Sequence, residues 1–320
     1  MFFLQVKELS KNNGERRAVD AISFSMEAGQ KIAIAGETGS GKTTLLKMIG
    51  GFIQPDSGVV LFEDKKVSGP LEQLIPGHPF IAYLSQHFEL RNNYAVHELL
   101  EMASKLDEAE AQKIFSVCQV EHLLLRRTNE LSGGEKQRIV LAMQLIKKPK
   151  LLLLDEPFSN LDAIHEQTIK QVIHDVCEQF RTSCIMVSHD GKDVLSWADT
   201  ILVMKEGQLI QKGTPQEIYH QPATLYCAGL FGSYNVLTPA LQQQFHLTAS
   251  NQTACIRPEK IKRTVDGIAA TAQQVRFYGM YEQVLLSVKG AMVELLQPVQ
   301  HTKPGDEFFI SIAQEDLFYC

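Results

Sequence analysis

The chain has 320 residues, of which 44% are hydrophobic and 21% charged, and its formal net charge is −6. This length allows about two domains, and the hydrophobic share is ordinary for a globular protein. The acidic balance argues against a general nucleic-acid binder, which usually carries a basic surface. No apolar run approaches the roughly 18 residues that span a membrane, and the apolar start is too short for a signal peptide.

Six cysteines are scattered along the chain, and none of them forms a C-x-x-C pair. Reduced, packed thiols are the default for such a pattern, and a structural zinc site is not expected. Together with the missing signal peptide, this pattern predicts a protein of the cytoplasm.

Residues 3–26 alternate apolar and polar side chains, which predicts an antiparallel β layer. Further along, short continuous apolar runs predict strands of a sheet that is covered on both faces. These runs are Ile32–Ala35, Leu151–Leu154 and Ile185–Val187. Because such runs alternate with helical patterns up to about residue 235, we expect a largely α/β architecture there.

A glycine-rich loop follows the first of these runs and fits the pattern G-x-x-x-x-G-K-[ST] at every fixed position. Its residues, here called the phosphate loop, are Gly36, Glu37, Thr38, Gly39, Ser40, Gly41, Lys42 and Thr43. A helix is predicted over Thr44–Phe52, and Thr44 at its start is counted among the nucleotide-binding residues. Backbone N–H groups and a helix N-terminus hold phosphate in this context. Lys42 would reach the β- and γ-phosphates, and the Thr43 hydroxyl would bind Mg²⁺.

Residues 98–127 are rich in leucine, glutamate, alanine and lysine, which predicts a helical subdomain over about residues 87–148. Near its end, Ser132 and Glu135 form an S-x-x-E capping box, which predicts a helix start. The apolar face of that helix is formed by Ile139, Met143 and Ile146. A glycine-rich helix start with a serine can bind an anion, although many helices begin this way without a ligand.

Two carboxylates, Asp155 and Glu156, directly follow the four-leucine strand. Ligands of open α/β sheets bind at the carboxyl ends of the strands. Asp155 is therefore placed to hold Mg²⁺, directly or through water, and Glu156 is the candidate general base for an attacking water. Two acids after a strand can also be a helix cap or a loop charge, but the phosphate loop upstream favours the functional interpretation.

These segments together resemble the ABC-type ATPases. The phosphate loop, the signature motif Leu131–Gln137 and Asp155-Glu156-Pro157 stand in the order and spacing of that family. Further matches are Gln86 for the Q-loop glutamine, Ser159–Asp162 for the D-loop and Ser188-His189-Asp190 for the switch histidine. The resemblance covers about residues 1–235 and implies a P-loop NTPase core with an antiparallel β layer and a helical subdomain.

The resemblance implies roles that the spacing alone does not. Two copies would pair head-to-tail and enclose two molecules of ATP with Mg²⁺. Ser132, Gly133 and Gly134 of one copy would bind the nucleotide held by the other, and Asp162 would line the boundary between the copies. Gln86 would sense Mg²⁺ and water and couple to the membrane partner. His189 would contact the γ-phosphate and stabilise the transition state.

After about residue 235 the pattern of the sequence changes from alternating strands and helices to short strand-like pieces. Thr238-Pro239, a glutamine-rich stretch and Asn251 mark a predicted boundary. Strand-like pieces at close spacing predict a small all-β domain over residues 236–320. These pieces are Ala254–Ile256, Val275–Tyr278, Gln283–Val288, Met292–Leu296 and Phe308–Ile312.

Two short segments of this domain, Ile256–Glu259 and Phe277-Tyr278-Gly279, resemble parts of the TOBE-like (OB-like) β-barrel appended to many importer ATPases. Those importers include the sugar, polyamine, ferric-iron and oxyanion groups. The resemblance implies a domain that builds the dimer and that in some members also regulates through a bound ligand; a purely structural role is the simpler expectation here. The resemblance also favours import over export.

The family usually stacks an aromatic ring on adenine in an early loop, but Asn12-Asn13-Gly14 occupies that loop here. Either Arg16 or Arg17 could supply a cation–π contact instead. We therefore expect only a modest preference between ATP and GTP. The signature motif also carries Glu135 where many relatives have glutamine, which adds a negative charge near a nucleotide.

The leading interpretation is an ATP-hydrolysing subunit of a membrane importer, driven by closure of the dimer on ATP. Its partners would be a second copy, transmembrane permease subunits and, indirectly, an extracytoplasmic binding protein, with no nucleic acid. It would lie in the cytoplasm, peripheral on the inner face of the cell membrane. The alternative is a soluble ABC ATPase of DNA repair or translation, but such proteins usually carry two nucleotide domains, zinc modules or coiled coils. The signature motif disfavours a phosphate-loop kinase, and Glu156 disfavours a scaffold without turnover.

Overall fold

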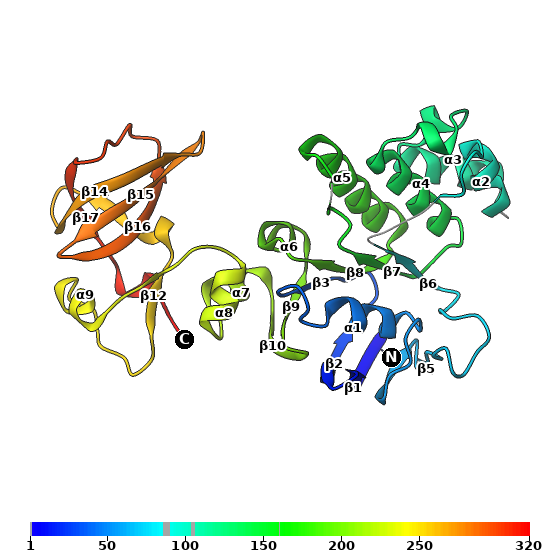
Figure 1. Cartoon of the computed structure of the whole chain (residues 1–320), viewed down its shortest axis with the longest axis horizontal. Helices are drawn as coiled ribbons and strands as arrows, with labels where there is room; N and C mark the ends of the chain where they lie inside the picture. The colour runs from blue at the N-terminus through cyan, green and yellow to red at the C-terminus, as the bar shows by residue number, and fades with distance from the viewer. Residues whose placement is uncertain (1, 86–89, 104–105, 160) are drawn as a thin grey trace. The chain divides into compact units, whose positions relative to one another are not determined.

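The computed structural model describes residues 2–85, 90–103, 106–159 and 161–320. The chain divides into two compact units, Met1–Pro215 and Gln216–Cys320 (Figure 1). The predicted domain boundary near residue 235 lies later in the chain than this division.

A six-stranded sheet with the strand order β10-β9-β3-β8-β7-β6 forms the centre of the first unit. Its strands are β3 (Lys31–Ala35), β6 (Ile81–Leu84), β7 (Leu151–Asp155), β8 (Ser183–Ser188), β9 (Thr200–Lys205) and β10 (Gln208–Gly213). All neighbours pair in parallel except β10, which is antiparallel to β9. The carboxyl ends of the parallel strands therefore meet at one edge of the sheet.

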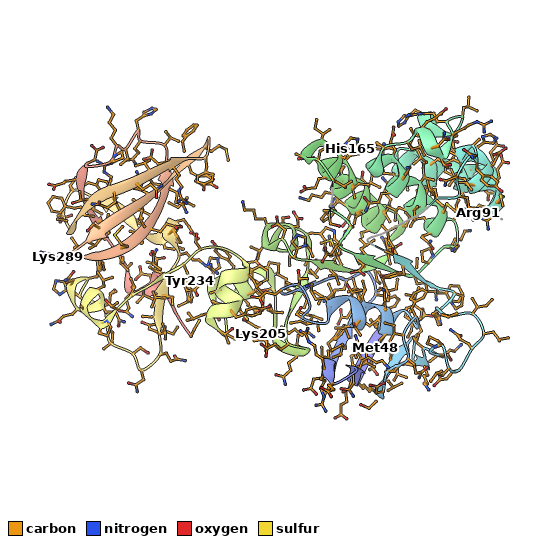
Figure 2. All side chains as sticks on the ribbon, viewed as in Figure 1. Met48, Arg91, His165, Lys205, Tyr234 and Lys289 are labelled. Carbon is orange, nitrogen blue, oxygen red and sulfur yellow. The ribbon has the colours of Figure 1, made fainter. Side chains whose placement is uncertain are left out.

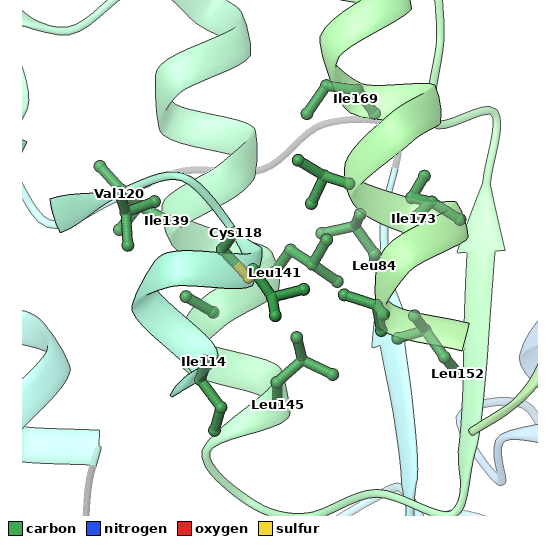
Figure 3. Close-up of a cluster of buried hydrophobic side chains, with 14 of the residues drawn as sticks. Leu84, Ile114, Cys118, Val120, Ile139, Leu141, Leu145, Leu152, Ile169 and Ile173 are labelled. Carbon is green, nitrogen blue, oxygen red and sulfur yellow. The ribbon is translucent and has the colours of Figure 1, made fainter. Parts of the chain in front are cut away.

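Residues of β7 alternate between two hydrophobic cores, which explains why this strand is continuously apolar. Leu152 and Leu154 pack in a core formed with helices on one face of the sheet (Figure 3). Leu151 and Leu153 pack in the core on the opposite face. Because both faces are covered, a polar side chain finds room only at the end of the strand, where Asp155 stands.

The second core lies between this sheet and the predicted antiparallel layer, which the structure confirms. The layer has the strand order β2-β1-β4-β5. Its strands are β1 (Leu4–Asn13), β2 (Arg16–Met26), β4 (Ser57–Phe62) and β5 (Lys65–Lys66). Helix α1 (Lys42–Ile49) fills the core, and it ends before the predicted Phe52 because Gly50 caps it and Gly51 has a φ of 76°.

The opposite face of the central sheet is covered by helices (Figure 1). They include α2 (Val96–Ala103), α3 (Glu108–Val117), α4 (Gly133–Leu145) and α5 (Ala163–Phe180), while α6 (Gly191–Trp197) follows β8. The predicted helical region 98–127 is thus interrupted, because Asp107 begins a new helix by accepting a hydrogen bond from the N–H of Glu110. The helical subdomain is otherwise built as predicted, with a 3-10 turn, Glu121–Leu123, before α4.

The second unit contains two antiparallel sheets, β11-β12-β18 and β13-β17-β14-β15-β16. Their strands are β11 (Asn235–Val236), β12 (Ala254–Ile256), β13 (Lys262–Thr264), β14 (Ile268–Phe277), β15 (Tyr281–Val288), β16 (Ala291–Pro298), β17 (Glu307–Ser311) and β18 (Leu317–Tyr319). Each predicted strand piece falls on one of them, whereas β11, β13 and β18 were not predicted. Thr238-Pro239, which marked the predicted boundary, caps and starts the helix α9 (Pro239–Gln244).

Arg257 holds two further helices, α7 (Pro215–His220) and α8 (Leu225–Leu230), onto the second unit. Its side chain is only 2% exposed, and Nη2 donates to the carbonyl oxygen of Tyr219 at 3.2 Å. Nη1 donates to the carbonyl oxygens of Ala228, Gly232 and Ser233 at 3.0, 2.9 and 3.1 Å. The guanidinium also lies over the ring of Tyr219, at 4.2 Å. These contacts explain why the compact units divide near the start of α7.

Replacing Arg257 by alanine should destabilise the second unit, because four carbonyl oxygens lose their cationic donor inside the protein. We expect the free energy of unfolding to fall by about 3 kcal/mol, measured by urea denaturation. Arg276→Ala is the matched control, since Arg276 is exposed on β14. Equal stability of the two variants would contradict this role of Arg257.

Candidate functional site

The phosphate loop joins the carboxyl end of β3 to the first turn of α1, and Lys42 is the first residue of that helix. The Lys42 side chain is buried, and its ammonium group donates to the carbonyl oxygens of Gly36 at 2.7 Å and Glu37 at 2.8 Å. Burial lowers the pKa of this ammonium group, while the nearby charges of Glu156, Asp155 and Glu37 act in the opposite direction. The loop thus holds one cation at its centre, close to three carboxylates.

Two glycines of the phosphate loop lie where a side chain would not fit. An ideal Cβ on Gly41 would lie 1.9 Å from the carbonyl oxygen of Ala18, and one on Gly36 would lie 2.3 Å from that of Met204. Gly41 also has a φ of 101°, a conformation that side chains disfavour. Because these glycines carry no side chain, the loop packs closely on the carbonyl oxygens behind it and its backbone N–H groups can approach phosphate. The phosphate loop therefore fits a nucleotide.

The carboxylate of Asp155 is held between two hydroxyl groups. Thr43, in the first turn of α1, donates from Oγ1 to Oδ1 at 2.8 Å, and Tyr83 of β6 donates from its hydroxyl to Oδ2 at 2.7 Å. Burial and the neighbouring Asp155 raise the pKa of Tyr83, so this phenol remains a donor. A carboxylate beside a threonine hydroxyl is a donor set that fits a hard cation such as Mg²⁺.

Glu156 follows β7 in an unusual backbone conformation, with a φ of 49°. Its N–H donates to the carbonyl oxygen of Val187 at 3.0 Å, and its own carbonyl accepts from the Ser159 hydroxyl at 2.8 Å. These bonds fix the turn against β8. The Glu156 carboxylate lies 3.3 Å from Nδ1 of His189, the residue after β8. The structure therefore brings the candidate base and the candidate switch histidine together.

The predicted capping box is present at the start of α4. Ser132 Oγ accepts from the N–H of Glu135 at 3.3 Å, and the Glu135 carboxylate accepts from the N–H of Ser132 at 2.7 Å. Arg126 donates to the other carboxylate oxygen at 2.9 Å. Burial opposes ionisation of Glu135, but these bonds bring its pKa below the usual value. The bonds also hold the turn that carries Gly133 and Gly134.

His165 of α5, labelled in Figure 2, contacts both Asp162 of the D-loop and Gly134 of the signature motif. Asp162 caps α5 by accepting from the N–H groups of Ile164 and His165, and its Oδ2 lies 2.6 Å from Nδ1 of His165. These bonds, led by the one from the His165 backbone, lower the pKa of Asp162. The same imidazole packs against Gly134, where an ideal Cβ would lie 2.9 Å from Cδ2.

Two cavities adjoin these residues, and Glu156 lines both. The first, of about 330 Å³, is lined by Asn13, Arg16, Ala18, Thr38, Gly39, Gly41, Lys42, Thr43, Thr44 and Glu156. The second, of about 340 Å³, is lined by Glu156, Phe158, Ser159, Glu166, Ser188, His189, Asp190 and Asp193. Among the residues that the structure describes, neither those of the signature motif nor Asp162 line the first cavity. Gln86 lies outside the residues that the structure describes.

The residues of the site that were not predicted include Tyr83, Arg126 and His165. Tyr83 stands in an apolar run, which by itself indicates only a strand before Gln86. Strand alternation would have placed it on the face toward α1, because Ile81 packs in the core on that face. Arg126 gives no local signal, since its partner Glu135 is nine residues away. The bond of His165 to Asp162 is local, but its contact with Gly134 is set by how the helices pack.

The profile of the ABC transporter family matches residues 19–159. The spermidine/putrescine import ATP-binding protein PotA of Mycoplasma mycoides is 36% identical over 241 residues, which are 74% of this chain and 69% of that protein. The Fe(3+) ions import ATP-binding protein FbpC 1 of Pectobacterium atrosepticum is 29% identical over 99% of this chain and 96% of its own length. The glucose import ATP-binding protein GlcV of Saccharolobus solfataricus is 31% identical over 82% and 80%.

Solved structures of the same kind match the fold. The structure of cbiO1 from Clostridium perfringens, part of the ABC transporter complex cbiONQ, covers 68% of this chain and 90% of its own at 29% identity, with a TM-score of 0.59. The ADP conformation of MJ1267, an ATP-binding cassette of an ABC transporter, covers 71% and 98% at 26% identity, with a TM-score of 0.61.

The chain therefore belongs to the ATP-binding subunits of ABC transporters. It is of the importer type, binds ATP and is an ATPase, which confirms the predicted family, fold class and activity. Within the described residues, no helix combines the length and the apolar character needed to cross a membrane.

Proposed function

We propose that two copies of this chain enclose two Mg·ATP head-to-tail, and that closure and hydrolysis drive import through separate permease subunits. One observation carries the pairing. The cavity at the phosphate loop is lined, among the described residues, by none of the signature motif, while Gly133 lies exposed at the start of α4. A second copy would complete the cavity by presenting Ser132, Gly133 and Gly134 to the nucleotide. A ligand that bridges two copies stabilises the closed state over the open one.

In this proposal the residues around Lys42 bind the triphosphate and Glu156 activates water. The ammonium group of Lys42 would exchange loop carbonyl oxygens for phosphate oxygens. Glu156 would accept the proton of the attacking water, and its fixed backbone turn aims the carboxylate. His189, beside that carboxylate, would contact the γ-phosphate, and Gln86 would contribute at the same place.

Glu156→Gln should reduce ATP turnover by about a thousandfold, because the amide does not accept the proton, while ATP binding persists. With MgATP the variant should accumulate as a dimer, measured by light scattering after gel filtration. Glu166→Gln, which changes an acid of the second cavity, is the control and should retain most turnover. Near-wild-type turnover of Glu156→Gln would exclude Glu156 as the base.

Gly133 offers a direct test of the pairing. Its ideal Cβ meets no described atom within 4 Å beyond its chain neighbours and its own helix, so we expect the monomer to accommodate a side chain there. Ser132 is less suitable, because its hydroxyl also caps α4. In a Glu156→Gln background, Gly133→Arg should abolish the ATP-dependent dimer because the long side chain fills the space between the two copies, while the melting temperature stays unchanged.

The control for this variant is Ser116→Arg, which adds the same charge at an exposed position of α3 in the same subdomain. Ser116→Arg should dimerise normally in gel filtration with ATP. An ATP-dependent dimer of undiminished affinity in Gly133→Arg would refute the head-to-tail arrangement.

We also propose that Thr43 and Asp155, with Gln86, hold the Mg²⁺ that accompanies ATP. The ion would neutralise charge on the β- and γ-phosphates. Tyr83 supports this site because it fixes the second oxygen of Asp155 and leaves Oδ1 toward Thr43. It thereby orients the carboxylate without binding the ion.

Tyr83→Phe should raise the Mg²⁺ concentration for half-maximal ATPase activity by about tenfold, because an unrestrained carboxylate is a poorer ligand. The measurement is a Mg²⁺ titration of turnover at saturating ATP. Tyr94→Phe, an exposed tyrosine elsewhere in this unit, is the control. An unchanged Mg²⁺ requirement in Tyr83→Phe would contradict the proposed site.

A groove on the helical subdomain supports a permease as partner. A cavity of about 360 Å³ is lined by Leu90, Arg91, Leu99, Met102, Val140, Met143 and Gln144. Most of these residues belong to α2 and α4, and Arg91, which precedes α2, is labelled in Figure 2. Met102 is 64% exposed, and methionine adapts to an apolar partner. We propose that a cytoplasmic segment of the permease docks here, which places the chain on the inner face of the membrane and the binding protein beyond direct contact.

The second unit would contribute to pairing of the copies. The turn between β14 and β15 exposes Phe277, Tyr278 and Met280, and the ring of Tyr278 stacks on that of Tyr281 at 5.2 Å. Such a preformed apolar tip suits contact with another copy. The relatives named for polyamine, ferric-ion and glucose import share the ATPase, so the cargo depends on the permease rather than on this chain.

A further inference from the structure

The cavity at the phosphate loop extends beyond the phosphate-binding residues to the hairpin of β1 and β2. Asn13, Arg16 and Ala18 line it on this side. Asn13 and Arg16 face each other across the end of the hairpin. The lining also includes Glu156, the proposed general base, beside which the terminal phosphate would lie. A nucleotide whose phosphates lie at Lys42 must therefore extend its ribose and base toward the hairpin.

Arg16 is fixed against the phosphate loop at the point where the hairpin meets it. Its Nη2 donates to the carbonyl oxygen of Gly39 at 2.8 Å. An ideal Cβ on Gly39 would lie 3.7 Å from both Nη1 and Nη2, so the two terminal nitrogens lie side by side over this residue. The guanidinium is thereby restrained before any ligand binds.

The neighbouring Arg17 is directed elsewhere. Successive residues of a strand point to opposite faces, and Arg17 pairs with Asp20 at 2.7 Å while its side chain is 61% exposed. The second oxygen of Asp20 accepts from Gln208 at 3.1 Å. Of the two arginines considered from the sequence, only Arg16 lines the cavity.

Among the described residues that line this cavity, none is aromatic, and Arg16 alone on the hairpin side carries a large planar cation. A guanidinium stacks well on aromatic faces. The same chain does this twice in its second unit, where Arg257 lies 4.2 Å from the centre of the Tyr219 ring and Arg263 lies 4.1 Å from that of Phe308.

We propose that Arg16 is the stacking surface for the nucleotide base and that it determines base preference in this ATPase. This inference rests on the proposed binding of the triphosphate at Lys42. Stacking depends on the area of the base and not on the hydrogen-bonding groups at its edge. The site therefore favours purine over pyrimidine nucleotides and discriminates little between adenine and guanine.

The test measures binding of ADP, CDP and inorganic pyrophosphate to the full-length chain by calorimetry. Arg16→Ala should weaken ADP binding by about 3- to 10-fold and reduce the preference of ADP over CDP. Pyrophosphate, which lacks a base, should bind the variant as it binds the wild type. Arg16→Lys should resemble Arg16→Ala, because it keeps the charge and loses the plane.

Arg17→Ala is the matched control and should bind ADP, CDP and pyrophosphate like the wild type. Unchanged ADP affinity in Arg16→Ala would overturn the proposal. Equal losses for ADP and pyrophosphate would overturn it as well, because Arg16 would then serve the phosphates. If the wild type bound pyrophosphate but not ADP, the base site would be refuted while the phosphate site stood; binding of neither would refute the proposed function itself.

Discussion

The chemistry of this ATPase depends on one carboxylate at the end of a buried strand. β7 has both faces covered by hydrophobic cores, so its first charged residue, Asp155, emerges only at the edge of the sheet. There Thr43 from α1 and Tyr83 from β6 each hold one of its oxygens. Three elements from distant parts of the sequence are thereby joined at one acid. The hydrogen bonds to Asp155, together with the bond from the Glu156 N–H to the carbonyl oxygen of Val187, fix the position of the adjacent Glu156.

The hydrogen bonds of Glu135 explain how the signature motif accommodates a glutamate where many relatives have glutamine. A glutamate near a bound nucleotide suggests electrostatic repulsion when only the sequence is considered. In the structure Glu135 accepts from the Ser132 backbone and from Arg126, so its charge is compensated within the chain. The turn gains rigidity from the extra charge, and the field at a neighbouring nucleotide is correspondingly smaller.

Features coded by local pattern could be predicted, and features set by long-range packing could not. The phosphate loop, the strand Leu151–Leu154 and the cap at Ser132 follow from spacing and side-chain type, and the structure contains all three. α9 was not predicted, because Thr238-Pro239 at its start is as typical of a domain boundary as of a capped helix. His165 and Arg257 act through contacts with residues 3 to 38 positions away, and no local pattern encodes the longer ones.

The clamp formed by Arg257 has a consequence for how such chains can be recombined. Because α7 and α8 are bound to it by main-chain carbonyl groups, these helices belong mechanically to the second unit rather than to the nucleotide-binding part. A chimera spliced near residue 235 would leave these helices without their arginine from the same parent. A crossover placed just before α7 would transfer α7, α8 and Arg257 together from the same parent.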